Sequence, residues 1–500
     1  MAAALSFDDL KSRAAGLQFR SQAFIGGRYV DAVSGETFDC ISPVDGRVLT
    51  QVAACGAEDV DRAVKAARAA FETGVWRDMA PARRKAKLLK FAELIKAHHD
   101  ELALLETLDM GKPIGDSHAV DVPATVNCIR WYAEAADKIY DEVAPTDPKV
   151  LAMIRREPVG VVAAIVPWNF PMIMAAWKIG PALASGNSLI LKPAEQSSLS
   201  AIRIAELAAE AGIPEGVFQV VPGLGEQAGK ALGLHEDIDA IAFTGSGEVG
   251  KLLLQYSGQS NMKRVALECG GKTPHIVLAD TSDLDQAAEA AAWGIFFNQG
   301  EVCNAGSRLL VQESIKEALM EKLLKISRSI KVGNPLDPQT KMGAIVDRDQ
   351  MDKVLRYIGI GQQEGAQLVL GGQQVQTAEG GYYVEPTVFD RVDNQMTIAR
   401  EEIFGPVLST LTFKDAEEGL RIANDTVYGL AAAVWTKNID TAHKMARGLR
   451  AGSVWINCFD GGDITTPFGG YKQSGFGRDK SLHAFDKYTE LKTVWIELGG

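Results

Sequence analysis

The pattern of hydrophobic and polar positions changes character along the chain. Residues 19–55 alternate polar and apolar positions between glycine- and proline-containing turns, which predicts short hairpin strands. From Ala57 to Phe71 the apolar positions recur at helical spacing, and helices are expected to continue from about 82 to 138. From Val159 onward, short apolar runs alternate with helical stretches. Strands are predicted at 159–167, 188–192, 217–221, 238–243 and 265–268, with helices at 171–184 and 198–211.

Strands and helices that alternate at these lengths are typical of a parallel, doubly wound α/β sheet. A second block rich in strands and helices runs from Pro274 to about Trp455. Two further segments, 150–158 and 489–498, alternate polar and apolar residues outside this rhythm. We expect both to form added strands that reach another subunit.

The composition narrows the class of protein. The 500 residues include 52 Lys and Arg against 64 Asp and Glu, a formal net charge of −12, which argues against nucleic-acid and anionic-membrane partners. No apolar run is long enough to span a bilayer, and the acidic N-terminus predicts no signal peptide. The six cysteines are scattered without a CxxC pair, so we expect free thiols, no metal site and a cytoplasmic location.

The run GSGEVG at 245–250 follows a predicted strand and opens a predicted helix. In that context the glycines let backbone amides and a helix N-terminus approach a pyrophosphate, which favours nucleotide binding over a tight packing turn. The same fingerprint includes an acid about 20 residues further on. Glu268 stands 268 − 247 = 21 residues after Gly247, so spacing alone would make it a ribose ligand.

Cys303 stands among small and polar residues in the run FFNQGEVCNAGSR at 296–308, just after an apolar helical stretch. A nucleophilic thiol needs space for a substrate and nearby amide dipoles, whereas free cysteines are often inert core residues. Local context leaves both possibilities open. Asn169 and Glu268 each lie where a predicted strand ends, which is where open parallel sheets bind ligands. Together the three side chains supply a nucleophile, an oxyanion donor and a base.

These features resemble the aldehyde dehydrogenase superfamily, and the resemblance covers nearly the whole chain. The matching blocks are PWNFP (167–171), LKPAE (191–195), FTGS (243–246), LECGGK (267–272), the Cys303 run (296–308), EEIFGPV (401–407) and PFGGYKQSG (467–475). The resemblance implies a Rossmann-like NAD-binding domain in 1–139 and 160–271 and a second α/β catalytic domain in 272–486. It also implies small β oligomerisation segments at 140–159 and 487–500, in a homo-oligomer that is a dimer or a tetramer.

The resemblance also implies a role for each candidate catalytic residue. Cys303 attacks the aldehyde carbon, and the Asn169 amide and the Cys303 N–H hold the oxyanion. Hydride loss to the nicotinamide leaves a thioester, which water activated by Glu268 hydrolyses. This role replaces the ribose assignment of Glu268. Lys178 assists proton transfer, with a plain surface lysine as the alternative.

The dinucleotide is expected to contact strand ends and turns. The implied residues are Val166, Pro167, Trp168, Lys192, Glu195, Gly225, Phe243, Thr244, Gly245, Ser246, Val249, Glu402 and Phe404. Lys192 and Glu195 hold the adenosine ribose, and Glu402 holds the nicotinamide ribose, whereas Trp168 and Phe404 have core packing as their alternative. A carboxylate near the 2′ position binds a hydroxyl but repels a phosphate, so Glu195 predicts NAD over NADP. Lys192 would offset part of that repulsion.

The aldehyde tunnel is expected to have aromatic walls and an acidic mouth. Its residues are Phe170, Trp177, Phe297, Val302, Asn304, Phe459 and Phe468, with Asp121, Asp460 and Asp463 near the mouth. The run 457–468 resembles the subgroup that oxidises ω-aminoaldehydes and γ-glutamylaminobutyraldehyde in polyamine breakdown. Aromatic walls and mouth carboxylates suit a cationic tail. Simple solvation of a loop is the alternative explanation for these acids.

Other functions remain open from sequence. A broad-specificity aliphatic or aromatic aldehyde dehydrogenase, or one for betaine aldehyde, fits the same blocks. A CoA-acylating relative generally lacks the carboxylate found at Glu268, and a thiol hydrolase would pair Cys303 with a histidine, none of which lies near it in sequence. A non-catalytic scaffold is disfavoured because Cys303, Glu268 and Asn169 are all intact. Cys269 is expected to be a bystander.

Overall fold

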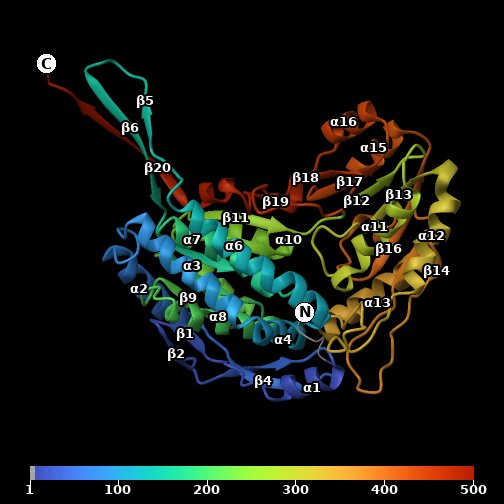
Figure 1. The fold of residues 1–500 in the computed structure, drawn as a ribbon, viewed down its shortest axis with the longest axis horizontal. Helices are drawn as coiled ribbons and strands as arrows, with labels where there is room; N and C mark the ends of the chain where they lie inside the picture. The colour runs from blue at the N-terminus through green and yellow to red at the C-terminus, as the bar shows by residue number, and fades with distance from the viewer. Residues whose placement is uncertain (1–5, 500) are drawn as a thin grey trace.

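The fold consists of two β-sheets, each covered by helices on both faces, and a projecting arm (Figure 1). The computed structural model describes residues 6–499. Residues 1–5 belong to the stretch in which no signal peptide is expected, and Gly500 ends the predicted oligomerisation segment; both lie outside the described residues. No helix within 6–499 is long and apolar enough to cross a membrane.

The strands of the first sheet run in the order β19-β11-β10-β7-β8-β9-β1-β2. Its parallel centre consists of β11 (Arg264–Cys269), β10 (Ala240–Gly245), β7 (Val161–Ile165), β8 (Ser188–Lys192) and β9 (Phe218–Val220). The antiparallel edges are the hairpin β1 (Ala23–Ile25) with β2 (Arg28–Val30), and β19 (Gly475–Phe476). β7 and β8 are buried at every position, as parallel strands covered on both faces should be.

Helices cover both faces of this sheet. On one face, α2 (Ala57–Glu72), α9 (Lys230–Leu234) and α10 (Gly247–Gln259) share a core with the strands. The other face carries α3 (Pro81–Ala97), α4 (His99–Met110), α6 (Val122–Ala135), α7 (Pro171–Ala184) and α8 (Leu199–Glu210). Shorter elements are α1 (Phe7–Ala15), α5 (Ile114–Asp116) and the π-helical turn η1 (Ser117–Asp121), besides the hairpin β3 (Thr37–Ile41) and β4 (Val48–Ala53). α7 starts with Pro171, whose missing N–H costs nothing at that position.

The strands of the second sheet run in the order β14-β15-β16-β13-β12-β17-β18. They are β14 (Gln367–Leu370), β15 (Thr387–Asp390), β16 (Val407–Phe413), β13 (Arg308–Gln312), β12 (Pro274–Val277), β17 (Ala431–Trp435) and β18 (Ser453–Ile456). β14 is antiparallel to β15, and the other neighbours are parallel. One face packs against α11 (Leu284–Phe296) and α12 (Lys316–Arg328), and the other against α13 (Arg348–Gln363), α15 (Ala416–Asn424) and α16 (Ile439–Gly448).

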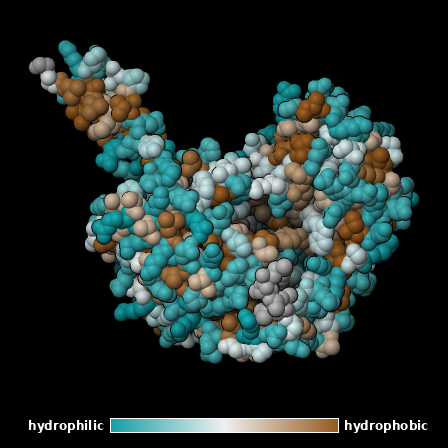
Figure 2. Space-filling view, in the orientation of Figure 1, coloured by the Kyte–Doolittle hydropathy of each residue, from teal (hydrophilic) through white to brown (hydrophobic). Residues whose placement is uncertain are grey.

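A separate antiparallel sheet projects from these two sheets as an arm (Figure 1). Its strands are β5 (Glu142–Ala144), β6 (Val150–Pro158) and β20 (Thr489–Glu497). β20 pairs with β6 along its whole length, from Thr489 opposite Pro158 to Glu497 opposite Val150. The arm keeps the apolar side chains of Leu491 and Trp495 exposed, and Figure 2 shows hydrophobic residues gathered on it.

The strands and helices expected from the hydrophobic pattern are confirmed to within a few residues, and α7 and β8 have the predicted bounds. The chain passes from the first sheet to the second between Cys269 and Pro274, at the expected domain boundary. β19 was not expected. It lies within the range assigned to the catalytic domain but joins the first sheet, where Gly475 pairs opposite Glu268.

Candidate active site

Cys303 lies on the loop between α11 and β13. Residues 298–300 take left-handed backbone angles there, which turns the chain sharply. Residue 300 has to be glycine, because a Cβ would collide with the backbone of Gly405. The turn brings Cys303 to a cavity wall, where it is partly exposed, whereas Cys269 is buried.

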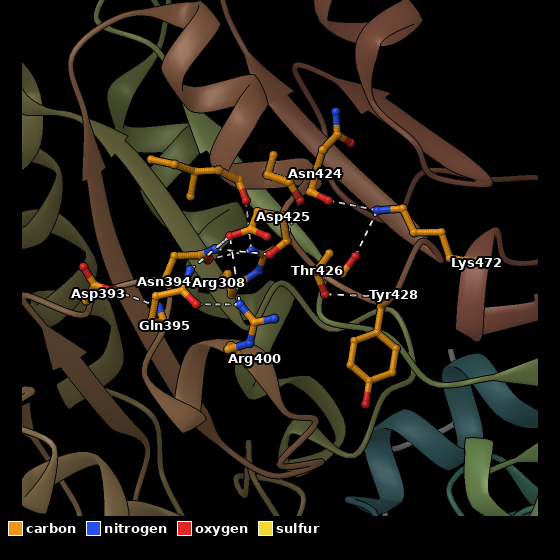
Figure 3. A network of polar contacts seen from close by, with 12 residues as sticks. Arg308, Asp393, Asn394, Gln395, Arg400, Asn424, Asp425, Thr426, Tyr428 and Lys472 are labelled. Atoms are coloured by element: carbon orange, nitrogen blue, oxygen red, sulfur yellow. Dashed lines mark hydrogen bonds and ion pairs between the residues drawn. The ribbon is translucent and has the colours of Figure 1, made fainter.

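A buried arginine at the start of β13 anchors this loop (Figure 3). The acceptors of the Arg308 guanidinium are the carbonyl oxygens of Lys272, Ile422 and Ala423 and the Asn394 side chain, at 2.9–3.2 Å. Asn394 in turn donates to Asp425 at 2.9 Å. Burial lowers the pKa of Arg308 to about 10, so the group stays charged at neutral pH. The network ties the chain beyond Cys303 to the loop after β11 and to the end of α15.

Asn169 is joined to the loop that carries Cys303. Asn169 follows β7, and its Nδ2 donates to the Glu301 carbonyl oxygen at 2.8 Å. Asn298 Nδ2 donates back to the Asn169 carbonyl oxygen at 3.1 Å. An amide nitrogen carries two N–H donors, so Asn169 keeps one for a ligand. The Cys303 N–H has no acceptor among the described residues. Two free donors beside the thiol fit an oxyanion hole.

Glu268 is buried near the end of β11. Its Oε1 has no hydrogen-bond partner among residues 6–499. Burial, and after it the charge of Asp479, raises the pKa of Glu268 to about 8, against the opposing charges of Lys178 and Lys487. A carboxyl group with this pKa exchanges its proton near neutral pH, as a general base for water must.

The surroundings of Cys303 disfavour the thiolate form of its side chain in the absence of a base. Burial first, and then the charges of Glu268 and Glu402, raise the pKa of Cys303 well above its ordinary value, while the Asn304 N–H acts to lower it. Glu268 is the strongest charge acting on the thiol. The nucleophile therefore needs an acceptor for its proton, and Glu268 is placed to provide one.

Lys178 of α7 is a buried residue, so the surface-lysine alternative is wrong. Its ammonium group forms an ion pair with Asp479, which pairs in addition with Lys487. Burial alone would raise the pKa of Asp479, but the two lysines lower it below its ordinary value. This charged group lies within electrostatic reach of Glu268.

The residues expected at the adenosine half of the cofactor lie at the carboxyl ends of β8, β9 and β10. Glu195 accepts hydrogen bonds from Lys192 Nζ at 3.3 Å and from the Gly225 N–H. Ser246 caps α10 by accepting from the Val249 N–H at 3.2 Å. Other members of the set buttress these ends: the Val166 N–H donates to the Lys192 carbonyl oxygen at 3.1 Å, and a Cβ on Gly245 would lie 2.5 Å from the Phe243 ring.

The residues expected at the nicotinamide half come from both sheets. Glu402 accepts from the Gly271 N–H at 3.0 Å, and its carboxylate lies where a side chain on Gly270 would be. Trp168, which follows Pro167, packs edge to face against Phe404 with ring centroids 5.2 Å apart. Burial raises the pKa of Glu402 to about 7.

These residues fit a dinucleotide. A carboxylate is available for each ribose, and α10 begins directly after the β10 turn, where the N–H groups of its first turn can bind a phosphate. The buried Thr244 Oγ1, just before this helix, has no partner among the described residues. An orphaned hydroxyl at this position is a further polar group that a ligand can satisfy.

A cavity of about 380 Å³ opens beside Cys303. Of the expected substrate residues, it is lined by Phe170, Trp177, Phe297, Val302, Asn304, Asp460, Asp463 and Phe468. The Phe170 and Phe297 rings are stacked with centroids 6.3 Å apart. Asn304 Nδ2 donates to Asp460 Oδ1 at 2.7 Å, which links the residue after the thiol to the mouth loop. The volume suits a small-molecule ligand.

The predictions that Phe459 lines the aldehyde tunnel and that Asp121 lies near its mouth are wrong. Asp121 is fully buried in η1, where Lys112 Nζ pairs with it at 2.5 Å and offsets part of the cost of burying the carboxylate. Phe459 lies against His275 instead of the cavity, with rings 5.2 Å apart and nearly parallel. Gly294 and Gly306 leave the space that its ring fills.

Two polar or reactive side chains stand among the cavity residues that were missed from sequence. Cys128 of α6 and Lys480 both line the wall. Burial raises the pKa of the Cys128 thiol above its ordinary range, and Lys480 Nζ lies 5.9 Å from the centroid of the Trp177 ring. Cys128 occupies an ordinary apolar helix position and Lys480 belongs to no motif, so neither had a signal in the sequence.

Comparisons with known proteins show the family of this chain. Residues 29–494 match the model of the Aldehyde dehydrogenase family. The chain is 54% identical to the NADP/NAD-dependent aldehyde dehydrogenase PuuC of Escherichia coli (strain K12), over 98% of each chain. It is 51% identical to the aminoacetaldehyde dehydrogenase of Pseudomonas aeruginosa, over 99% of each. A crystal structure of γ-glutamyl-γ-aminobutyraldehyde dehydrogenase from Burkholderia cenocepacia J2315 is similar with a TM-score of 0.97 and 60% identity, covering 99% of this chain and 100% of that one.

An indole-3-acetaldehyde dehydrogenase in complex with NAD+ is similar as well, with a TM-score of 0.98 and 61% identity over 99% of this chain and 100% of that one. The predicted fold class and enzyme class are confirmed by these matches. The match over residues 29–494 shows that this chain belongs to the aldehyde dehydrogenase family.

Proposed function

We propose that this protein oxidises an aldehyde with a nitrogen-bearing, charged tail to the carboxylic acid, with NAD+ as the oxidant. The substrates in view are ω-aminoaldehydes and γ-glutamylaminobutyraldehyde. One observation carries the proposal: a single cavity with aromatic walls contains both Cys303 and the acids Asp460 and Asp463. The names of the relatives from Pseudomonas aeruginosa and Burkholderia cenocepacia support the same substrate class.

The first step takes place at Cys303. Its thiol gives its proton to Glu268, the strongest charge acting on it, and Sγ attacks the aldehyde carbon. The oxygen of the resulting thiohemiacetal takes up negative charge between the Asn169 Nδ2–H and the Cys303 N–H. Each such donor is worth roughly 2.7–4 kcal/mol in the transition state. NAD+, when bound, supplies the hydride acceptor that converts the thiohemiacetal to a thioester.

Hydrolysis completes the reaction and depends on Glu268. Once Glu268 has released the thiol's proton to solvent, its orphaned, buried Oε1 accepts a proton from water as the water attacks the thioester carbon and the Cys303 thiolate leaves. The same two N–H donors hold the oxyanion again. The charges of Lys178 and Lys487 limit how far the pKa of Glu268 is raised, whereas Asp479, which pairs with both lysines, adds to the rise. A carboxylate in this position supports hydrolysis over transfer to CoA.

Lys192 and Glu195 would bind the adenosine ribose, and Glu402 the nicotinamide ribose. We propose NAD+ as the preferred cofactor, because Glu195 is held by Lys192 and by the Gly225 N–H with its charge toward this site. Measurement of kcat/KM for both cofactors tests the preference. E195Q should reduce the preference for NAD+ over NADP+, and a wild-type preference for NADP+ would overturn the assignment.

A substrate panel followed by NADH formation tests the substrate class. We expect γ-glutamylaminobutyraldehyde or an ω-aminoaldehyde to have a higher kcat/KM than propionaldehyde, betaine aldehyde and indole-3-acetaldehyde. The aromatic walls make indole-3-acetaldehyde the sharpest competitor, since a structural relative is named for it. If it is the best substrate of the panel, the proposed class is wrong.

We further propose that the arm joins copies of this chain into a dimer or tetramer in the cytoplasm. Leu491, Trp495 and Ile496 on β20 are exposed, and a monomer rarely leaves such a strand uncovered. The free thiols of residues 6–499 fit a reducing compartment. Light scattering should give a dimer or larger for the wild type and a smaller species for L491D/W495D. A wild-type monomer would rule the assembly out.

A further inference from the structure

The mouth of the cavity, at the end away from Cys303, carries the ammonium group of Lys480. Lys480 lines the same cavity as Cys303, with its Nζ 5.9 Å from the centroid of the Trp177 ring. Lys480 and Ser481 both have left-handed backbone angles, with φ of 60° and 51°. This turn separates two neighbouring side chains: Asp479 is buried against Lys178, whereas Lys480 faces the cavity.

The protein's own carboxylates leave this ammonium group available. Asp460 and Asp463 act on Lys480 through their charge alone, without a hydrogen bond. Asp460 Oδ1 accepts from Asn304 at 2.7 Å, and Asp463 Oδ1 accepts from the Thr465 hydroxyl at 2.6 Å. Gly462 stands between these two acids in the sequence. A Cβ added to Gly462 would lie 3.4 Å from Lys480 Nζ. The mouth of the cavity therefore carries the Lys480 ammonium group and the two carboxylates of Asp460 and Asp463 on the same wall.

We propose that Lys480, Asp460 and Asp463 form a subsite for a substrate tail that ends in both a carboxylate and an ammonium group, as an α-amino acid does. This inference rests on the proposed function and deepens it. Lys480 donates to the tail carboxylate, and the two aspartates accept from the tail ammonium group. The Trp177 ring, whose centroid lies 5.9 Å from Lys480 Nζ, gives the ammonium group a cation–π contact.

The charge pattern selects between the two substrate groups of the proposed function. A free ω-aminoaldehyde brings only a cation, which Lys480 repels and the aspartates attract, so its net gain is small. A γ-glutamylamino tail brings charges of both signs and satisfies all three groups. A hydrogen bond from the half-buried Lys480 ammonium group to the tail carboxylate is worth about 1.5–3 kcal/mol, roughly tenfold or more in affinity, whereas the exposed aspartates each contribute less.

A matched pair of aldehydes tests the subsite. γ-Glutamylaminobutyraldehyde is compared with its analogue in which 4-aminobutanoyl replaces γ-glutamyl, so that only the carboxylate is lost. We expect wild-type enzyme to prefer the carboxylate-bearing aldehyde by about tenfold or more in kcat/KM. K480M should reduce this ratio to near one, whereas K480R should retain most of it. K444M, on the exposed face of α16, is the control and should keep the wild-type ratio.

The outcomes separate this inference from the proposed function. If the wild type favours γ-glutamylaminobutyraldehyde but K480M keeps the preference, the subsite is wrong and the proposed function stands. If the wild type oxidises the analogue as well as the carboxylate-bearing aldehyde, the subsite is again wrong. If neither nitrogen-bearing aldehyde is oxidised better than propionaldehyde, the proposed function itself fails. The wild-type comparison needs no variant, so poor folding of K480M leaves the test intact.

Discussion

The two ends of the substrate cavity are built differently. At the reaction end, Asn169, Glu268 and the Cys303 loop come from separate elements. Buried hydrogen bonds and the Arg308 network hold Asn169 and the Cys303 loop, and Glu268 is positioned by strand β11. At the far end, Asp460 and Asp463 are exposed on one loop. The reaction end needs positions accurate to a fraction of an ångström, because reacting atoms must align. The far end needs charge of the right sign, which a loop can provide.

This difference predicts that variants at the two ends change different kinetic constants. Changes at the reaction end should lower kcat for every aldehyde, because they remove groups that act in the transition state. Changes at the far end should alter KM for charged tails and leave the ranking of plain aldehydes alone. The experiments below follow the expected size of the effect, from the largest to the smallest.

Replacement of Cys303 should have the largest effect. C303A removes the nucleophile, and we expect NADH formation from any aldehyde to fall by about 10⁴-fold or more. C458S is the control, because Cys458 is exposed and plays no part in the proposed chemistry. Alkylation mapped by mass spectrometry should reach Cys303 before the buried Cys269. Retained turnover in C303A would remove the covalent mechanism.

Removal of the Glu268 carboxylate should rank second. General bases contribute roughly 10²–10⁴-fold, so E268Q should lower kcat by that range while substrate binding persists. The wild-type pH profile gives an independent check. Glu268 acts in its deprotonated form and its pKa is raised to about 8, so kcat should rise about tenfold per pH unit below 8 and level off above it. A profile that is flat from pH 6 to 9 would contradict this role.

Loss of the oxyanion donor at Asn169 should rank third. N169A removes one of two donors, and a fall in kcat of roughly 10²–10³-fold is expected with little change in KM. N169D keeps the size of the side chain but replaces a donor with an acceptor, so it should be at least as impaired. Equal losses in kcat for charged and plain aldehydes would assign the effect to the reaction end.

The smallest effect is expected at the mouth. D460N and D463N remove charges near solvent, where single ion pairs contribute about 0.2–1 kcal/mol, so KM for nitrogen-bearing aldehydes should rise roughly two- to fivefold. High salt should shrink the difference from wild type. D440N in α16 provides a surface control. A matching rise in KM for propionaldehyde would show that the loop had moved instead of losing a charge.

Much of the fold and of the reaction end was predictable because its signals are local. β8 and α7 appear with their expected bounds, since an apolar run and a proline at a helix start depend only on neighbouring residues. Cys303, Glu268 and Asn169 each stand in a recognisable block. In the structure Asn169 is hydrogen-bonded to the loop that carries Cys303, and the charge of Glu268 acts on the thiol. β19 was missed because a two-residue strand has no periodicity to detect.

The mouth of the cavity was predicted less well, for an electrostatic reason. Whether an acid faces solvent depends on whether a cation packs against it in the fold. Asp121 pairs with Lys112, nine residues earlier, and is buried, whereas Asp460 accepts a hydrogen bond from Asn304 and stays on the cavity wall. Neither pairing follows a spacing pattern that the sequence reveals.

The sequence by itself determined the α/β class and the family, and it predicted Cys303 as the nucleophile, because these rest on local periodicity and on contiguous blocks of residues. Only the tertiary structure decided how those residues are tuned. Burial together with Asp479 raises the pKa of Glu268, a partner carboxylate keeps Lys178 inside, and a left-handed turn aims Lys480 into the cavity. Desolvation and charge pairing are properties of three-dimensional neighbours, and the order of residues along the chain does not contain them.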